Sequence, residues 1–144
     1  MNGMSGNLKD ENPAMSPLCA QDAFSRQDEG DDASFYETDR FVSHLDSAAR
    51  QTIERLIGDL IVEEDAAILD LMAGWESHIP KTIKAARVVG LGLNENELKQ
   101  NPALTEHAIH DLNRDPRLPF EDNTFDVVLN TVSVDYMTKP IEVF

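Results

Sequence analysis

The sequence predicts an α/β fold: a doubly wound parallel sheet of about four strands, preceded by one amphipathic helix. Two observations carry this prediction. Four short apolar segments alternate with polar, helix-forming or turn-forming stretches, and the first two segments are apolar almost throughout. Strands buried on both faces have such a composition, and strands that alternate with helical connections are typical of a parallel sheet covered on both faces.

Residues 1–34 are predicted to be a disordered acidic leader. They hold few large apolar side chains and an acidic cluster at positions 28, 29, 31 and 32. Such a stretch cannot bury enough surface to offset the entropy lost on ordering. The cluster could alternatively dock a partner. We expect the folded domain, residues 35–144, to begin at Phe35, and the leader to be dispensable for folding.

An amphipathic helix is predicted between Leu45 and Leu60, where apolar side chains recur at steps of three and four residues. Ser43 is the expected N-cap, and Asp46 places a negative charge in the first turn, where the helix dipole favours it.

Four strand candidates follow: residues 66–72, 87–93, 108–112 and 125–134. Residues 75–84 are predicted to hold a short helix limited by Pro80, and residues 94–100 a second short helix. Residues 113–124 contain two prolines and an Asp-Asn pair, which indicate a loop.

Composition narrows the possible partners. The 27 acidic and 12 basic side chains give a net charge of -15, which repels a phosphate backbone or an anionic lipid surface. We therefore expect a small-molecule substrate rather than nucleic acid or a membrane. Cys19 is the single cysteine, and no signal pattern or apolar run of ~20 residues occurs. A cytoplasmic location is expected, while the oligomeric state stays open.

Ligands of open parallel sheets bind beyond the carboxyl ends of the strands, so candidate site residues are expected there. Asp70, Ala73 and Gly74 close the first strand, and Gly74 would let backbone approach a ligand closely. The same segment is also compatible with an ordinary strand-to-helix turn. After the second strand, a nucleoside-binding fold commonly places an acid for the ribose hydroxyls, and this position is Gly92.

Asn94 and Glu95 follow closely and could supply the missing ribose acceptor, although both equally suit the cap and first turn of the next helix. Asp111 and Leu112 end the third strand with a carboxylate and an apolar neighbour, which suit the edge and face of an adenine.

A longer segment, residues 118–130, reads Leu-Pro-Phe, a turn, and then Phe-Asp at the start of the fourth strand. Together with Asp111 it resembles the corresponding part of class I S-adenosylmethionine-dependent methyltransferases, and the resemblance covers about residues 35–144. More narrowly, the chain resembles an uncharacterised bacterial and plant branch of the type 11 methyltransferase-like proteins at Phe35-Tyr36, Arg40-Phe41-Val42, Leu69-Asp70-Leu71-Met72, Trp75, Ser77-His78 and residues 126–134.

The resemblance implies a Rossmann-like fold, S-adenosylmethionine as cofactor, and methyl transfer to an unknown, small acceptor. By position, the methionine end of the cofactor would meet Asp70, Ala73 and Gly74, the ribose Asn94 or Glu95, and the adenine Asp111 and Leu112. The first and third glycines of the family's loop are Met72 and Glu76 here. The alternative function is therefore that of a family relative that has lost catalysis and serves as a binding or interaction module.

Candidate acceptor-side residues are Tyr36, His44, His78 and Tyr136, each of which could equally be a packed or surface side chain. No histidine spacing indicates a metal site, and no Gly-x-Gly-x-x-Gly turn supports a nicotinamide dehydrogenase.

Family domains have seven strands, whereas four are predicted here. We therefore expect a C-terminally truncated domain that associates through its exposed fourth strand and lacks turnover.

Overall fold

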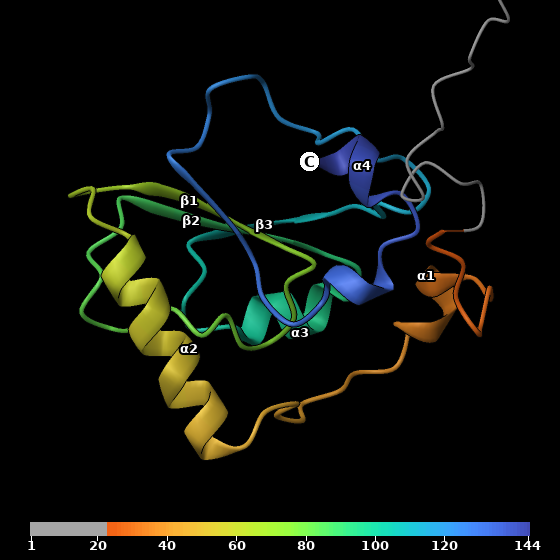
Figure 1. Cartoon of the computed structure of the whole chain (residues 1–144), viewed down its shortest axis with the longest axis horizontal. Helices are drawn as coiled ribbons and strands as arrows, with labels where there is room; N and C mark the ends of the chain where they lie inside the picture. Colours follow the sequence, from red (N-terminus) through yellow and green to blue (C-terminus); the bar gives the residue numbers. More distant parts are fainter. Residues whose placement is uncertain (1–22) are drawn as a thin grey trace, which may run out of the picture.

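The computed structural model describes residues 23–144, which form a four-stranded sheet with helices on both sides (Figure 1). The strands are β1 (Ala67–Leu71), β2 (Arg87–Gly92), β3 (Glu106–Ile109) and β4 (Val127–Asn130). All pairings are parallel, and the order is β3-β2-β1-β4. The predicted Rossmann-like α/β sheet is confirmed. Its strand order reverses between β1 and β4, which is where such sheets bind ligands.

The central strands lie where the sequence predicted them, and the edge strands do not. The predictions for β1 and β2 were right to within one residue at each end. β3 begins two residues before its predicted start, because Glu106 joins the sheet edge and pairs with Arg87 at 2.7 Å. It ends at Ile109, three residues before its predicted end, so Asp111 and Leu112 lie in the loop that follows the strand instead of ending it. β4 is shorter than predicted, because the left-handed backbone of Val132 (φ 51°) ends the extended segment and a 3-10 helix, η2 (Val134–Tyr136), follows.

The long helix, α2 (Ser47–Leu60), is confirmed, but Ser43 is not its cap. The Asp46 carboxylate accepts a hydrogen bond from the Ala49 amide at 2.8 Å and caps the helix, whereas the Ser43 hydroxyl donates to the Leu45 carbonyl. Asp46 is the cap because its side chain lies next to the first free amide groups of the helix.

The second predicted short helix is confirmed and the first is wrong. Helix α3 (Glu95–Gln100) is capped by Asn94, whose side-chain oxygen accepts from the Glu97 amide at 2.9 Å. Residues 75–84 are irregular, with one turn at residues 81–82, instead of helical. His78 has a left-handed backbone there (φ 54°), and the Trp75 indole donates to the Val42 carbonyl at 3.0 Å, so tertiary contacts override the helical pattern.

The predicted border between leader and domain falls inside helix α1 (Asp32–Phe35). Asp32 forms an ion pair with Arg26 at 2.7 Å and accepts a hydrogen bond from the Asn113 side-chain amide at 2.7 Å. The second contact connects this part of the chain to the loop after β3. The disorder predicted for residues 1–22 lies outside the described residues.

Two apolar clusters cover the two faces of the sheet. On one face, Ile68 of β1 and Val88 of β2 pack against Ile57 of α2 and against Ile61, which directly follows α2. On the other face lie the following buried side chains: Leu69, Leu71, Val89, Leu91, Leu112 and Met137. Figure 1 shows α2 and α3 on one side and α4 (Pro140–Val143) on the other. Within residues 23–144, none of the helices is long and apolar enough to cross a membrane.

The turn after β1 presses against the end of β2. The Ala73 amide donates to the Leu91 carbonyl at 2.8 Å, and a Cβ atom at Gly92 would lie 2.3 Å from the Ala73 carbonyl oxygen. No side chain of any kind fits at Gly92. The close approach therefore explains why the position expected to hold a ribose-binding acid is a glycine.

Gly92→Ala is expected to lower the free energy of unfolding by about 1–3 kcal/mol, because the new methyl group would overlap a backbone oxygen that cannot rotate away. Gly58→Ala is the control: it lies in α2, its Cβ would contact only the Pro80 ring at 3.3 Å, and alanine favours the helix. Urea denaturation measures both. A Gly92→Ala protein as stable as the wild type would contradict the close approach.

Candidate functional site

A cavity of about 990 Å³ lies beyond the carboxyl ends of the strands. Its wall contains segments that follow each strand, namely residues 72–76, 91–94, 110–113 and 131–133, and residues from the N-terminal part of the chain between 25 and 44. Ligand pockets in proteins commonly have volumes of about 300–1,000 Å³. The cavity is thus large enough for a nucleoside-sized ligand, at the place where the fold binds ligands.

Strained backbone borders this cavity. Met72 (φ 56°), His78 (φ 54°) and Val132 (φ 51°) all line it and all have left-handed backbone. Such conformations cost non-glycine residues roughly 1–3 kcal/mol each and concentrate at ligand sites. The resemblance noted from the sequence places the first glycine of the family's loop at Met72, and the backbone there has the left-handed conformation that glycine adopts most readily.

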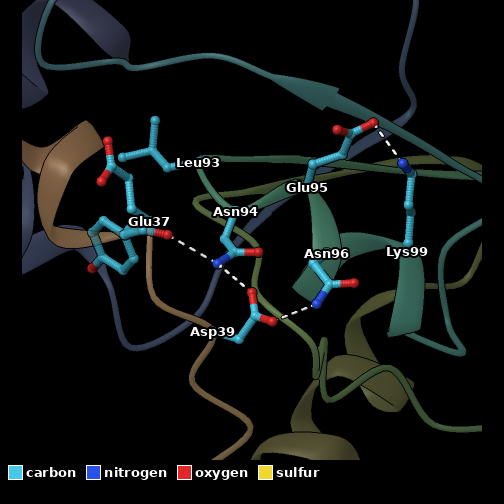
Figure 2. A pocket seen from close by; sticks show the side chains of 8 residues that line it. Glu37, Asp39, Leu93, Asn94, Glu95, Asn96 and Lys99 are labelled. Carbon is cyan, nitrogen blue, oxygen red and sulfur yellow. Dashed lines mark hydrogen bonds and ion pairs between the residues drawn. The ribbon is translucent and has the colours of Figure 1, made fainter.

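The N-terminal strap, residues 36–44, is fastened to α3 and to the turn after β1. The Asn94 side-chain amide donates to the Tyr36 carbonyl and to the Asp39 carboxylate, at 2.9 Å from each. Asp39 also accepts from Asn96, and Figure 2 shows Asp39 between the Asn94 and Asn96 side chains. The Trp75 indole holds the strap at its other end through Val42. These bonds fix the strap as one wall of the cavity.

Most of the predicted site residues meet at this cavity. Five of them line it: Ala73, Gly74, Asn94, Asp111 and Leu112. Glu95 does not. It lines a smaller neighbouring pocket of about 270 Å³, where its carboxylate pairs with Lys99 at 2.8 Å (Figure 2).

Asp70 lies in β1 beneath the cavity and does not line it. Its side chain is buried, and burial raises the pKa of its carboxyl from 3.8 to about 7, while a hydrogen bond from Ser77 lowers it. The Asn101 side-chain amide donates to the Ser77 hydroxyl at 2.7 Å and to the Gly74 carbonyl at 2.9 Å. Asp70 therefore belongs to a buried polar network that supports the Gly74 turn from below.

Sequence reasoning missed Glu97, which is 6% exposed and lines the cavity. One oxygen, Oε1, accepts a hydrogen bond from the Arg40 amide at 2.6 Å. A Cβ atom at Gly74 would lie 3.3 Å from the other oxygen, Oε2. The only sequence signal is the spacing Asn94-x-x-Glu97, which resembles a capping box and predicts a local helix cap rather than a contact across the fold.

The four candidate acceptor-side residues, Tyr36, His44, His78 and Tyr136, also line the cavity. Burial raises the pKa of Tyr36. The His78 Nδ1 atom is buried and has no hydrogen-bond partner within the described chain. A buried nitrogen without a partner is costly.

Charge on the cavity wall is strongly negative. Two arginines line it; Arg26 pairs with Asp32, and the Arg40 guanidinium lies 3.7 Å from the centre of the Phe35 ring. Seven acidic residues line the same cavity: Asp28, Asp31, Asp32, Glu76, Glu97, Asp111 and Asp135. This wall favours neutral or cationic ligands over polyanions. Between residues 23 and 144, no group of three His, Cys, Asp or Glu side chains is placed to hold a metal ion.

Comparison with known proteins identifies the fold. A solved structure described as "Complex between the Haloferax volcanii Trm112 methyltransferase activator and the putative methyltransferase" matches with a TM-score of 0.50 and 20% sequence identity. The match covers 67% of this chain and 48% of that chain, so this chain spans about half the length of the solved one. No family model and no curated protein matches the sequence. The chain has a methyltransferase-like Rossmann fold.

Val132→Gly is expected to raise the free energy of unfolding by about 0.5–1 kcal/mol, because glycine removes the left-handed strain of a β-branched residue and only part of this gain is lost to unfolded-state entropy. Val134→Gly is the control: Val134 is similarly exposed, at 51% against 49%, but its backbone is not left-handed. Equal destabilisation of both variants in urea denaturation would show that Val132 is not strained.

Asp70 is expected to make stability depend on pH. Its pKa is raised in the folded state, so the folded protein binds the proton more tightly than the unfolded chain does. The resulting contribution to the free energy of unfolding is fully present below pH 4 and is lost as pH rises through about 7. Asp70→Asn removes the titration. Between pH 5 and pH 8 the variant should gain on the order of 2 kcal/mol relative to the wild type. Urea denaturation curves that shift equally for both proteins would contradict this.

Proposed function

We propose that this chain binds S-adenosylmethionine in the large cavity as part of a methyltransferase that acts on a small-molecule acceptor, and that the chain by itself lacks turnover. The cavity carries the proposal: it lies beyond the carboxyl ends of all four strands, next to the point where strand order reverses, in a methyltransferase-like fold. A cytoplasmic location fits this function and belongs to the proposal.

The residues present suit the cofactor at both ends. The negative wall favours the ammonium and sulfonium charges of the cofactor, and the Ala73-Gly74 turn leaves space for its methionine end. The Asp111 Oδ1 atom accepts from the Asn113 amide at 2.9 Å, while its Oδ2 accepts no hydrogen bond from the described residues and is available to a ligand. Leu112, 4% exposed, provides an apolar floor for a base.

Asp70 and Asn94 have supporting parts in this proposal. Asp70 positions the Gly74 turn through Ser77 and Asn101. Asn94 uses its side-chain nitrogen to hold the strap and its oxygen to cap α3. Both residues thus act on the shape of the cavity.

Bound S-adenosylmethionine supplies an electrophilic methyl group. The protein then has to hold the acceptor in line and exclude water, since positioning contributes most to such a displacement. The segment after β4, residues 131–133, and the strap form the wall where an acceptor would lie. His44 and His78 also line the cavity, and an imidazole there would be the group to accept a proton from the acceptor where its chemistry requires it.

A second candidate function is a binding module without turnover, and Glu76 favours it. This residue stands where the methyltransferase loop has its third glycine, and its carboxylate binds the Arg50 guanidinium at 3.1 Å and the Ser43 hydroxyl. Glu76 thus ties the turn after β1 to α2 and to the strap, which is a structural use of a cofactor-loop position. A folded chain that shows no binding of S-adenosylhomocysteine in a calorimetric titration would support this alternative.

Calorimetric titration with S-adenosylhomocysteine is expected to show saturable binding to the wild-type chain. Asp111→Asn should weaken that binding roughly 10-fold, the loss expected for one hydrogen bond to a charged group. Asp122→Asn is the matched control, because Asp122 is exposed and lies outside the cavity. A wild-type chain that gives no binding heat and no rise in melting temperature with this ligand would contradict the proposed function.

A further inference from the structure

The end of β2 offers no acceptor for ribose hydroxyls at the expected positions. Gly92 cannot carry a side chain, because the Ala73 carbonyl fills the space. Asn94 has both side-chain polar atoms engaged with Tyr36, Asp39 and the Glu97 amide. Glu95 points into the neighbouring pocket toward Lys99 (Figure 2).

Glu97 is the remaining carboxylate of this part of the wall, and it is placed differently. It lines the cavity although the residue is only 6% exposed. No Lys, Arg or His side chain between residues 23 and 144 forms an ion pair with it. A buried carboxylate without a cation is costly unless donors satisfy both of its oxygens.

Only one of these oxygens is satisfied by the protein. Oε1 accepts from the Arg40 amide at 2.6 Å, which fixes the orientation of the carboxylate, whereas Oε2 accepts no hydrogen bond from the described residues. Oε2 lies beside the turn after β1, at 3.3 Å from the place of a Cβ atom on Gly74. Glu97 is thus held in a fixed orientation, with a free acceptor atom between the Gly74 turn and the end of β2.

The close approach at Gly92 and the position of Glu97 are linked. Because the turn after β1 occupies the space where a side chain of residue 92 would lie, a ligand's sugar cannot be bound from that position. Glu97 lies in the first turn of α3, and the hydrogen bond from its amide to the Asn94 cap fixes its place in that turn. Its carboxylate lies next to Gly74, in the cavity wall that runs from the Gly74 turn past the end of β2 to Leu112.

We propose that the Glu97 carboxylate binds the ribose hydroxyls of the nucleoside ligand in the cavity, in place of an acid at the end of β2. A carboxylate oxygen accepts strong hydrogen bonds from vicinal hydroxyl groups, and these donors supply the partners that Oε2 lacks. This inference rests on the proposed function and names a residue that determines which ligands the cavity selects.

The test compares S-adenosylhomocysteine with its 2′,3′-dideoxy counterpart by calorimetry on the full chain. The wild type is expected to bind the ribose ligand roughly 10- to 100-fold more tightly than the dideoxy ligand, as for one or two hydrogen bonds to a charged group. Glu97→Gln should reduce this ratio at least 5-fold, as predicted from the loss of charge-assisted bonds. Glu95→Gln, a neighbouring carboxylate outside the cavity, should keep the wild-type ratio.

The outcomes separate the two proposals. A wild type that binds both ligands equally, or a folded Glu97→Gln protein with the wild-type ratio, overturns the role of Glu97 and leaves the proposed function standing. A wild type that binds neither ligand overturns the proposed function and this inference together. If circular dichroism shows that Glu97→Gln is unfolded, Glu97→Asp, which retracts the charge by one methylene, replaces it and should likewise lower the ratio.

Discussion

The contact between the turn after β1 and the end of β2 determines the rest of the site. Ala73 donates to the Leu91 carbonyl, and its own carbonyl excludes any side chain at Gly92. To reach this position the chain leaves β1 through a left-handed Met72. The Asn101 side-chain amide donates a hydrogen bond to the Gly74 carbonyl and stabilises the turn. One backbone contact thus fixes the floor of the cavity and leaves the end of β2 without an acid.

This arrangement is maintained at an energetic cost that the apolar core offsets. Asp70 is buried in the central strand with one neutral hydrogen-bond partner, Ser77, and this burial raises the pKa of its carboxyl. Apolar clusters pack against both faces of the same strand, through Ile68 on one face and Leu69 on the other. Three residues with left-handed backbone, Met72, His78 and Val132, lie at the ligand-facing end of the sheet. Asp65 and Asn123 precede β1 and β4 at the opposite end and are of types that adopt this conformation more readily.

Sequence patterns predicted the features that depend on local chemistry. The apolar runs located β1 and β2, and the Asn94 cap located α3, because burial on both faces and capping leave a signature in neighbouring residues. Strand ends converge in any parallel sheet, so Gly74 and Asp111 could be expected near one cavity. Features created by contacts across the fold could not be predicted in this way. Trp75 binds the strap at Val42, and this contact replaces the predicted helix. The Arg40 amide binds one Glu97 oxygen and thereby orients the other toward the cavity. Both contacts join residues more than 30 positions apart.

The central claim is that a nucleoside cofactor lies across the ends of the strands, between the Gly74 turn and Leu112. An amide ¹H–¹⁵N correlation spectrum of the full chain, recorded during titration with S-adenosylhomocysteine, tests this claim most directly. The account predicts saturable shifts at Gly74, Gly92, Glu97 and Leu112, with little change along α2. Spectra that stay unchanged, or shifts confined to α2 and the outer edge of β3, would contradict it.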